Sequence, residues 1–183
     1  MKTETTLETR RLRLRSWQRS DARPFDQFCN TPKVMRWLGG VQPKAQLLQD
    51  VAYFIASERR DGVTFWVVER LTDDAFLGFC GLIVIPKGKC PVGGDFGIGW
   101  RLRSDVWRQG YALEAASAVL RFGFEQMGRT QILSRTAKGN KASLGLMRRL
   151  GMKRCPELDY LCPSEQSVLM AHIISNSATS REQ

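Results

Sequence analysis

The chain has few of the residues that bind transition metals or cross-link small domains. Its 183 residues include one histidine, His172, and five cysteines, none of them in a Cys-x-x-Cys pair. One histidine and an odd number of unclustered cysteines do not favour a zinc site or a disulfide framework. We therefore expect no metal, reduced thiols of the kind found in the cytoplasm, and a structural role for His172.

Long apolar runs are also missing. The longest, around residues 79–85, is too short to cross a bilayer and predicts a buried strand instead. The opening residues are polar and charged, among them Lys2, Glu4 and Arg10, and no apolar signal-peptide core follows them. The expectation is a cytoplasmic protein that is neither secreted nor inserted in a membrane.

No internal repeat, linker or low-complexity segment divides the sequence. Its length suits one domain, and its hydrophobic content of 43% and charged content of 25% are ordinary for a globular protein. The sequence predicts a single domain over residues 1–183, with an ordered core of about residues 8–175 and a polar, frayed C-terminal tail.

Hydrophobic periodicity predicts strands and helices in a definite order. After a strand at 11–15 come two helices, one beginning at Ser20 or Asp21 and one at Pro43. The first helix is expected to contain Phe25, Phe28 and Val34, and the second to carry Leu47, Leu48, Val51 and Ile55 on one face. A hairpin follows, with strands at 64–70 and 76–85.

The second half of the chain alternates between strands and helices. After a Gly- and Pro-rich loop at 87–94, the expected elements are a strand at 96–102, a helix from residue 112, a strand at 130–136, a helix from residue 140 and a last strand at 168–174. This order predicts an α/β layered domain.

The most informative segment runs from Gly97 to Ala116. It predicts a strand, a turn that contains Arg108 and Gly110, and a helix that opens on small residues. A helix N-terminus offers unpaired backbone N–H groups and a partial positive charge, and glycine lets the backbone approach an anion closely. We therefore expect this turn to bind a pyrophosphate.

A second segment, residues 140–152, predicts a capped amphipathic helix. Asn140 is a good N-cap, and Leu144, Met147 and Leu150 recur at helical spacing. Taken alone, this pattern describes a helix packed on a sheet. Together with the glycine turn upstream, it indicates a second contact for the same ligand.

Basic residues dominate the chain, which has 28 Lys and Arg against 18 Asp and Glu, for a net charge of +10. The stretch from Arg135 to Arg154 holds seven basic residues and no acidic one. A positive field there favours a polyanionic cofactor, and it equally favours RNA or a ribosomal surface. Since no aromatic residues are interleaved for base stacking, direct nucleic-acid binding is the less favoured interpretation.

The two segments resemble those of the GNAT superfamily of acyl-CoA-dependent N-acyltransferases, and within it the branch of ribosomal-protein N-terminal acetyltransferases. The family's pyrophosphate motif is Gln/Arg-x-x-Gly-x-Gly/Ala, and Gly110 and Ala112 match its last two places. A tryptophan stands at the first place, as is common in the branch. The segment at 9–15 and the Asn140-x-x-Ser143 helix start are also similar. The resemblance implies the GNAT fold, a central mixed, mostly antiparallel sheet flanked by helices.

The resemblance also implies direct transfer of an acetyl group from acetyl-CoA to a primary amine, without a covalent enzyme intermediate. The strand before the glycine turn and the next parallel strand are expected to splay apart. Backbone groups near Leu102 would then bind the pantetheine arm or the thioester oxygen. A bulge in the strand from Phe96 to Arg103 would suit this geometry. Asn140 would bond the pantetheine arm. The residues that would bind the pyrophosphate are Arg108, Gln109, Gly110, Tyr111 and Ala112.

The acid and the base of the reaction are harder to assign. Many GNAT proteins have a tyrosine as the acid seven residues after the asparagine, where this chain has Met147. The resemblance therefore gives the acid role to Ser143. A serine at this position is equally consistent with a role in capping the helix alone. The branch often has a glutamate at the position of Gly97. Asp95 and Glu69 are the candidate replacements, and a bound water with no single base is the third alternative.

The acceptor and the assembly stay open. A protein N-terminal α-amine, including that of a ribosomal protein, and a small-molecule amine both fit, whereas the positive charge does not favour a polyamine. Trp37, Phe54 and Trp66 are either walls of an acceptor site or core. A homodimer is compatible with the resemblance. The alternatives to an enzyme are a non-catalytic acyl-CoA-binding or regulatory module and a basic protein that associates with ribosomes or RNA.

Overall fold

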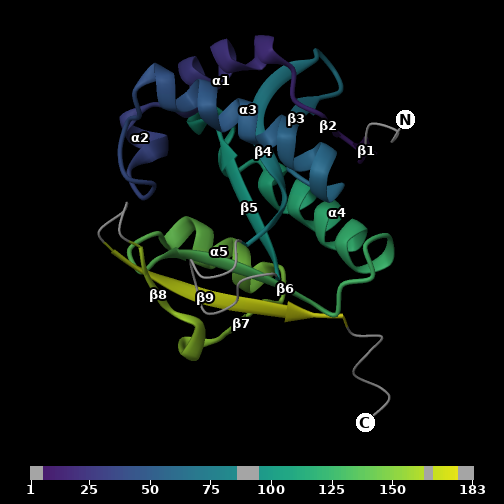
Figure 1. Cartoon of the computed structure of the whole chain (residues 1–183), viewed down its shortest axis with the longest axis vertical. Helices are drawn as coiled ribbons and strands as arrows, with labels where there is room; N and C mark the ends of the chain where they lie inside the picture. Colours follow the sequence, from purple (N-terminus) through teal and green to yellow (C-terminus); the bar gives the residue numbers. More distant parts are fainter. Residues whose placement is uncertain (1–5, 86–94, 163–166, 177–183) are drawn as a thin grey trace.

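The computed structural model describes residues 6–85, 95–162 and 167–176. Figure 1 shows a twisted sheet with helices packed against it. The helices are α1 (Ala22–Cys29), α2 (Pro32–Met35), α3 (Lys44–Asp61), α4 (Tyr111–Glu125) and α5 (Lys141–Arg149). The strands are β1 (Leu7–Glu8), β2 (Leu12–Arg15), β3 (Phe65–Arg70), β4 (Ala75–Val84), β5 (Phe96–Leu102), β6 (Gln131–Ala137), β7 (Lys153–Arg154), β8 (Tyr160–Cys162) and β9 (Ser167–Ser175).

The strands form one sheet in the order β1-β2-β3-β4-β5-β6-β9-β7, with β8 also paired to β9. Every pairing is antiparallel except that of β5 with β6, which is parallel. The expected α/β fold with a mixed, mostly antiparallel sheet is therefore confirmed. The predicted loop at 87–94 and most of the predicted tail lie outside the described residues. None of the helices in the described ranges combines the length and hydropathy needed to cross a membrane.

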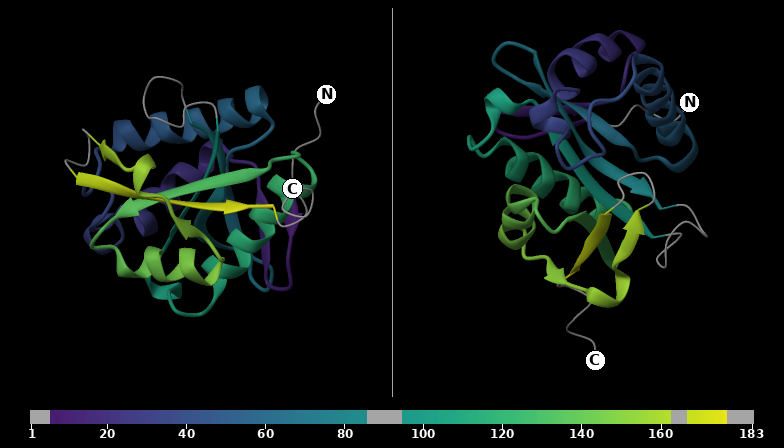
Figure 2. Two further views of the ribbon diagram at one scale, coloured as in Figure 1. Left: turned by 90° about the horizontal axis from the view of Figure 1, so that it is seen from below. Right: turned by 90° about the vertical axis from the view of Figure 1, so that its left-hand side faces the viewer.

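The sheet separates two hydrophobic cores, with α3 on one face and α4 and α5 on the other (Figure 2, left). β4 is buried on both faces: Leu82 packs in the core beneath α4, and Phe79 packs in the core beneath α1 and α3. Trp66 is fully buried against Phe122 of α4, and Phe54 belongs to the opposite core. Both aromatic residues are therefore core.

The first predicted helix is divided in two. It was expected to continue through Val34, but α1 ends at Cys29 and a separate short helix, α2, begins at Pro32. Proline lacks the N–H that a continuous helix needs, and it is well suited to the first turn of a new one. The Thr31 side chain caps that turn by accepting a hydrogen bond from the Val34 N–H at 3.4 Å.

The long helix α3 buries a narrower stripe than expected. Leu47, Val51 and Phe54 are buried, whereas Leu48 is 50% exposed and Ile55 is half-buried. Residues spaced by four and three share one face of a helix, and the next position along the chain is turned about 100° away. Leu48 therefore does not share the buried face with Leu47 and Val51, contrary to the prediction that all of them lie on one face.

The bulge expected in β5 is absent from its pairing with β4, which keeps one register from Gly78↔Leu102 to Val84↔Phe96. The irregularity lies one strand away, where Leu77 of β4 is an extra residue opposite β3. Beside it, Gly78 has a φ of +132°, and a Cβ there would come within 2.1 Å of the Arg101 carbonyl oxygen. The bulge thus depends on glycine, because β5 passes too close for any side chain.

Candidate active site

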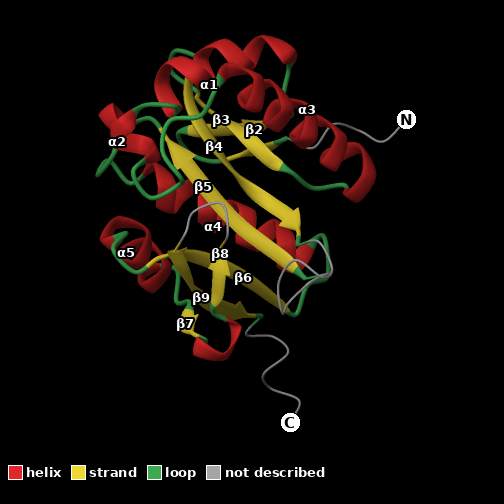
Figure 3. Cartoon of the chain, turned by 60° about the vertical axis from the view of Figure 1, so that its left-hand side comes forward, coloured by secondary structure: helices red, strands yellow, loops and turns green. Residues whose placement is uncertain are grey.

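The parallel strands β5 and β6 separate in the middle of the sheet. Among the described residues they pair at Gly97↔Leu133, and the Ser134 hydroxyl then donates to the Ile98 carbonyl at 3.1 Å. Beyond this point β6 and β9 turn away from β5 (Figure 3). A cleft of about 1430 Å³ opens there, lined by both strands, α2, the turn before α4, and one side of α5. The expected splaying of the two strands is confirmed.

The edge of β5 presents backbone groups to this cleft. In an antiparallel pair, only alternate residues bond to a given neighbour. The Arg103 N–H donates to the Leu77 carbonyl at 2.8 Å, which assigns the odd-numbered residues of β5 to β4. The backbone groups of Trp100 and Leu102 therefore point away from β4, toward the cleft.

One of those groups is already occupied. The indole N–H of Trp107 donates to the Leu102 carbonyl at 2.8 Å. The Leu102 carbonyl therefore already has a partner, and the Leu102 N–H is the group of this residue that faces the cleft. Trp100 presents both its N–H and its C=O to the cleft. Trp107 thus ties the turn to the end of β5.

The turn before α4 has the shape expected of an anion site. Arg108 and Gly110 have left-handed φ values of +64° and +85°, and Gly110 is the N-cap of α4 without a side-chain capping bond. A Cβ at Gly110 would lie 3.3 Å from Nη2 of Arg11. The N–H groups of the first helical turn, at Tyr111 and Ala112, therefore start an uncapped helix beside the cleft.

A brace from the segment between β1 and β2 holds this turn. The Glu114 carboxylate accepts hydrogen bonds from the Thr9 hydroxyl (2.7 Å), the Arg11 N–H (2.9 Å) and the Arg11 Nε (2.7 Å). Arg11 in turn donates to the Gln109 carbonyl at 3.0 Å and lies 4.3 Å from the centre of the Tyr111 ring. Burial raises the pKa of Glu114, but the hydrogen bonds from Thr9 and Arg11 outweigh it, and the net pKa is lowered.

Ser143 connects α5 to β5 across the cleft. Its backbone N–H donates to the Asn140 side-chain oxygen at 3.2 Å, which confirms Asn140 as the N-cap of α5. Its hydroxyl accepts a hydrogen bond from the Trp100 indole at 3.3 Å. The structure therefore brings Asn140, Ser143 and Leu102 to one cleft with Arg108, Gly110, Tyr111 and Ala112 of the turn, whereas Gln109 does not line it.

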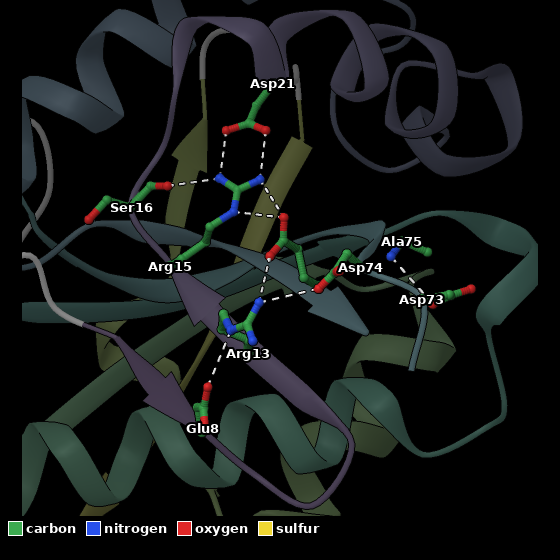
Figure 4. Close-up of polar contacts among 9 residues, drawn as sticks. Glu8, Arg13, Arg15, Ser16, Asp21, Asp73, Asp74 and Ala75 are labelled. Atoms are coloured by element: carbon green, nitrogen blue, oxygen red, sulfur yellow. Dashed lines mark hydrogen bonds and ion pairs between the residues drawn. The ribbon is translucent and has the colours of Figure 1, made fainter. Parts of the chain in front are cut away.

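The two carboxylates considered as a base do not line the cleft. Asp95 immediately precedes β5, and the cleft begins four residues later, about 13 Å along an extended chain. Glu69 forms ion pairs with Arg15 at 2.6 Å and Arg13 at 3.8 Å. Figure 4 shows that Arg15 also donates hydrogen bonds to both carboxylate oxygens of Asp21 in the same network. The geometry supports a base role for neither Asp95 nor Glu69.

The cleft is strongly positive. The described part of the chain contributes no Asp or Glu to its lining, and it contributes seven cations. They are Lys33, Arg101, Arg108, Arg135, Lys141, Arg148 and Arg149. The sequence predicted the positive field from residues 135–154, but it did not show that Lys33 and Arg101 would join it. No group of three or more His, Cys, Asp or Glu able to hold a metal occurs within the described ranges.

Trp37, the third aromatic considered as an acceptor wall, is half-buried against the chain just before α5. Its ring lies so close to Gly139 that a Cβ there would approach the ring to 2.3 Å. It is absent from the cleft lining. Trp37 is thus a packing residue that supports the start of α5.

Two bacterial proteins are similar to this chain over most of its length. The chain is 33% identical over 153 residues to the uncharacterized protein YkkB of Bacillus subtilis, a match that covers 83% of this chain and 87% of that protein. It is 26% identical over 151 residues to the uncharacterized N-acetyltransferase YnaD of the same organism, covering 81% and 82%.

Solved structures share the fold. An acetyltransferase from Agrobacterium tumefaciens matches with a TM-score of 0.80 at 22% identity, covering 94% of this chain and 95% of that one. A GNAT-family acetyltransferase from Bacillus anthracis matches with a TM-score of 0.76 at 20% identity, covering 93% and 98%. The ribosomal-protein acetyltransferase RimL, solved in complex with coenzyme A, matches with a TM-score of 0.75 at 15% identity, covering 95% and 99%.

The GNAT acetyltransferase domain family matches residues 11–153, a range that contains the strand split, the glycine turn and the capped start of α5. This range reaches from Arg11, which braces the turn, to the first residue of β7 after α5. The chain therefore belongs to the GNAT family of acetyltransferases.

Proposed function

We propose that this acetyltransferase moves an acetyl group directly from acetyl-CoA to a primary amine. One observation carries the proposal: a single cleft at the β5–β6 split joins an uncapped helix N-terminus at Gly110 to the hydroxyl of Ser143. The first feature suits the phosphates of the cofactor, and the second suits the chemistry at its thioester end.

The residues of the cleft fit acetyl-CoA. The backbone of residues 108–112 would hold the pyrophosphate, and the surrounding cations would attract it. The backbone groups of Trp100 and the N–H of Leu102, together with Asn140, would bond the pantetheine amides. When bound, acetyl-CoA supplies the activated acetyl thioester. The fold relative RimL has been solved with coenzyme A, which supports this assignment.

Ser143 is the proposed acid. A serine hydroxyl has one proton to donate and can accept hydrogen bonds through its lone pairs. Because the Trp100 indole donates to this oxygen, the bond between them does not use the Ser143 proton. It is then available to the sulfur that leaves during transfer. Trp100 acts through Ser143 and is a positioning residue.

The positive field of the cleft replaces a dedicated base. Nearby cations disfavour the ammonium form of a bound amine and lower its pKa. A larger fraction of the acceptor is then neutral and nucleophilic near neutral pH. The transfer exchanges a carbon–sulfur bond for a carbon–nitrogen bond. The amine gives up one proton to water, the sulfur takes the Ser143 proton, and the Ser143 oxygen recovers a proton from that water.

The acceptor is a protein N-terminal α-amine or a small-molecule amine. Enzymatic transfer is tested by titrating the protein with acetyl-CoA in a calorimeter and then measuring thiol release against a panel of amines. The proposal expects binding of acetyl-CoA and thiol release that requires an amine. Binding of acetyl-CoA with no release from any amine would contradict the proposed transfer.

A further inference from the structure

A short loop connects the two walls of the cleft. Residues 31–41, which include α2, lead from the end of α1 toward α3, and we call them the bridging loop. The Asn30 side chain holds the ends of this loop together: its Nδ2 donates to the Gln42 carbonyl at 2.9 Å, and its Oδ1 accepts from the Gln42 N–H at 2.8 Å. Within the loop, Val34 and Met35 are buried. The bridging loop is therefore a compact unit that is fixed at its ends and in its middle.

The bridging loop contacts the turn before α4 on one side of the cleft. Lys33 lies 5.6 Å from the centre of the Trp107 ring, within the range of a cation–π contact. The Trp107 indole in turn donates to the Leu102 carbonyl at 2.8 Å. Because Lys33, Val34 and Leu38 line the cleft, the loop is also part of its wall. One side of the loop is thus joined to the glycine turn and to the end of β5.

On the other side of the cleft, the bridging loop packs against the residue that precedes the cap of α5. The Trp37 ring lies so close to Gly139 that a Cβ at Gly139 would come within 2.3 Å of Cη2 and 2.6 Å of Cζ3 of the ring. The Arg36 guanidinium lies 5.0 Å from the centre of the same ring and helps to hold it there. Glycine permits this close approach because it has no Cβ.

Gly139 is linked directly to the residues that hold the proposed acid. Asn140 follows it in the chain, and the Asn140 side chain accepts a hydrogen bond from the Ser143 N–H at 3.2 Å. The Lys141 N–H donates to the Gly139 carbonyl at 2.9 Å. Across the cleft, the Ser143 hydroxyl accepts from the Trp100 indole at 3.3 Å. A shift of Gly139 would therefore move the start of α5 and change the distance between the Ser143 hydroxyl and β5.

We infer that Trp37 is a positioning residue for the transfer, and that it acts on Ser143 through its contact with Gly139. The inference rests on the proposed function, in which Ser143 is the acid. Trp37 does not line the cleft, so its effect is to hold the start of α5 at a fixed distance from β5. Precise placement matters because a misplacement of about 1 Å in a reacting group can cost about 100-fold in rate.

Hydrogen exchange in the ligand-free protein tests the contact without any reaction. In Trp37→Ala, the Ser143 amide should exchange about tenfold faster by NMR, because the cap that protects this amide has lost its support. Trp37→Phe keeps a ring against Gly139 and should restore most of the protection. Tyr53→Ala is the matched control: Tyr53 is an aromatic residue on α3 that lies outside the cleft lining, and its loss should leave this exchange unchanged. Wild-type exchange at Ser143 in Trp37→Ala would overturn the inference.

Kinetics in two backgrounds test whether Trp37 acts through Ser143. In the otherwise wild-type protein, Trp37→Ala should lower kcat for thiol release about tenfold, while the calorimetric affinity for acetyl-CoA changes by about twofold or less. In the Ser143→Ala background, the same substitution should lower kcat by no more than about twofold, because the hydroxyl that Trp37 positions is gone. An equal loss of kcat in both backgrounds would overturn the inference.

Gly139→Ala tests the same contact from its other side. The added Cβ would displace the Trp37 ring and should lower kcat to a similar extent. In the Trp37→Ala background the ring is absent, so Gly139→Ala should have little further effect. Losses that multiply in the double variant would overturn the contact as the cause. If Trp37→Ala fails to fold, Gly139→Ala with and without Ser143→Ala provides the same comparison.

The results distinguish this inference from the proposed function. Absence of thiol release with every amine would overturn both together. An unchanged kcat in Ser143→Ala would remove the acid and with it the role of Trp37, while leaving acetyl transfer in place. Equal losses from Trp37→Ala in the two backgrounds would overturn the positioning role alone. The inference stands if exchange at Ser143 is faster in Trp37→Ala and the loss of kcat disappears in the Ser143→Ala background.

Discussion

A substitution at Gly110 should weaken coenzyme A binding strongly while lowering the stability of the fold only slightly. Gly110→Glu adds a Cβ at a φ of +85° and a negative charge where we propose that a pyrophosphate binds. The left-handed backbone costs a non-glycine residue about 1–2 kcal/mol. The nearest neighbour of the new Cβ is the end of the flexible Arg11 side chain, at 3.3 Å, which can move aside. Folding should therefore survive.

The added charge has the larger effect. Two unit charges about 4 Å apart repel by about 4 kcal/mol at an effective dielectric constant of about 20. Even part of this energy weakens binding on the order of 100-fold. Titration calorimetry with coenzyme A measures the affinity, and thermal unfolding measures stability, where a loss of about 1–2 kcal/mol lowers the Tm by about 2–8 °C.

Gly128→Glu is the matched control. Gly128 also has a positive φ, +61°, and a Cβ there would meet nothing within 4 Å. It follows α4 and does not line the cleft. Both variants should lose similar stability, and only Gly110→Glu should lose coenzyme A. A folded Gly110→Glu protein with wild-type affinity would refute the phosphate site, and equal loss of binding in both variants would refute its location.

The proposed acid, its indole partner and two titrating side chains have distinct expected outcomes. Ser143→Ala should lower kcat by about 100-fold with little change in acetyl-CoA affinity, and an unchanged kcat in the thiol-release assay would remove it from the mechanism. Trp100→Phe removes the hydrogen bond to Ser143 and should lower kcat by roughly fivefold with a similar affinity for acetyl-CoA. The thiol-release assay measures this change, and an unchanged kcat would show that the indole does not position the hydroxyl. The folded-state pKa of Glu114 is lowered from 4.5, so its stabilisation is present above pH 4.5 and is lost as the pH falls through the folded pKa. Urea unfolding from pH 3 to 7 should show this loss, and Glu114→Gln should remove it. Burial lowers the pKa of His172 from 6.5, so stability should also decline as the pH falls below 6.5. The proton NMR titration of the chain's one histidine should give a midpoint below 6.5, and a midpoint at or above that value would contradict its burial.

The sequence predicted the parts of the site that depend on local interactions. A glycine with a positive φ before a helix and an asparagine that caps the N–H three residues later are both formed within a few residues. Gly110 and the Asn140–Ser143 cap could therefore be read from spacing alone. The alternation of β5 was equally local, and it placed Leu102 at the end of the strand.

Contacts between distant segments could not be read in this way. The Trp100–Ser143 hydrogen bond joins residues 43 positions apart, and the Arg11–Glu114 brace joins residues 103 positions apart. Nothing in either segment specifies its partner, because these pairs meet only when the sheet order and the strand split are known. Asp95 immediately precedes β5 and is not in the cleft lining, a position that depends on where along the strand the split begins.

The charge of the cleft was predicted only in part. The run of basic residues at 135–154 is continuous in sequence, so its positive field could be anticipated. Arg101 and Lys33 come from a different strand and from the short helix α2, and they join that field only through the fold.

The central claim is that the β5–β6 split holds coenzyme A with its sulfur at Ser143. A crystal structure of the complex with coenzyme A tests it most directly. The account predicts the pyrophosphate on the N–H groups of the residue 108–112 turn and the sulfur about 3.5 Å from the Ser143 hydroxyl oxygen. Coenzyme A bound outside the split, or a sulfur remote from Ser143 with the phosphates in place, would contradict it.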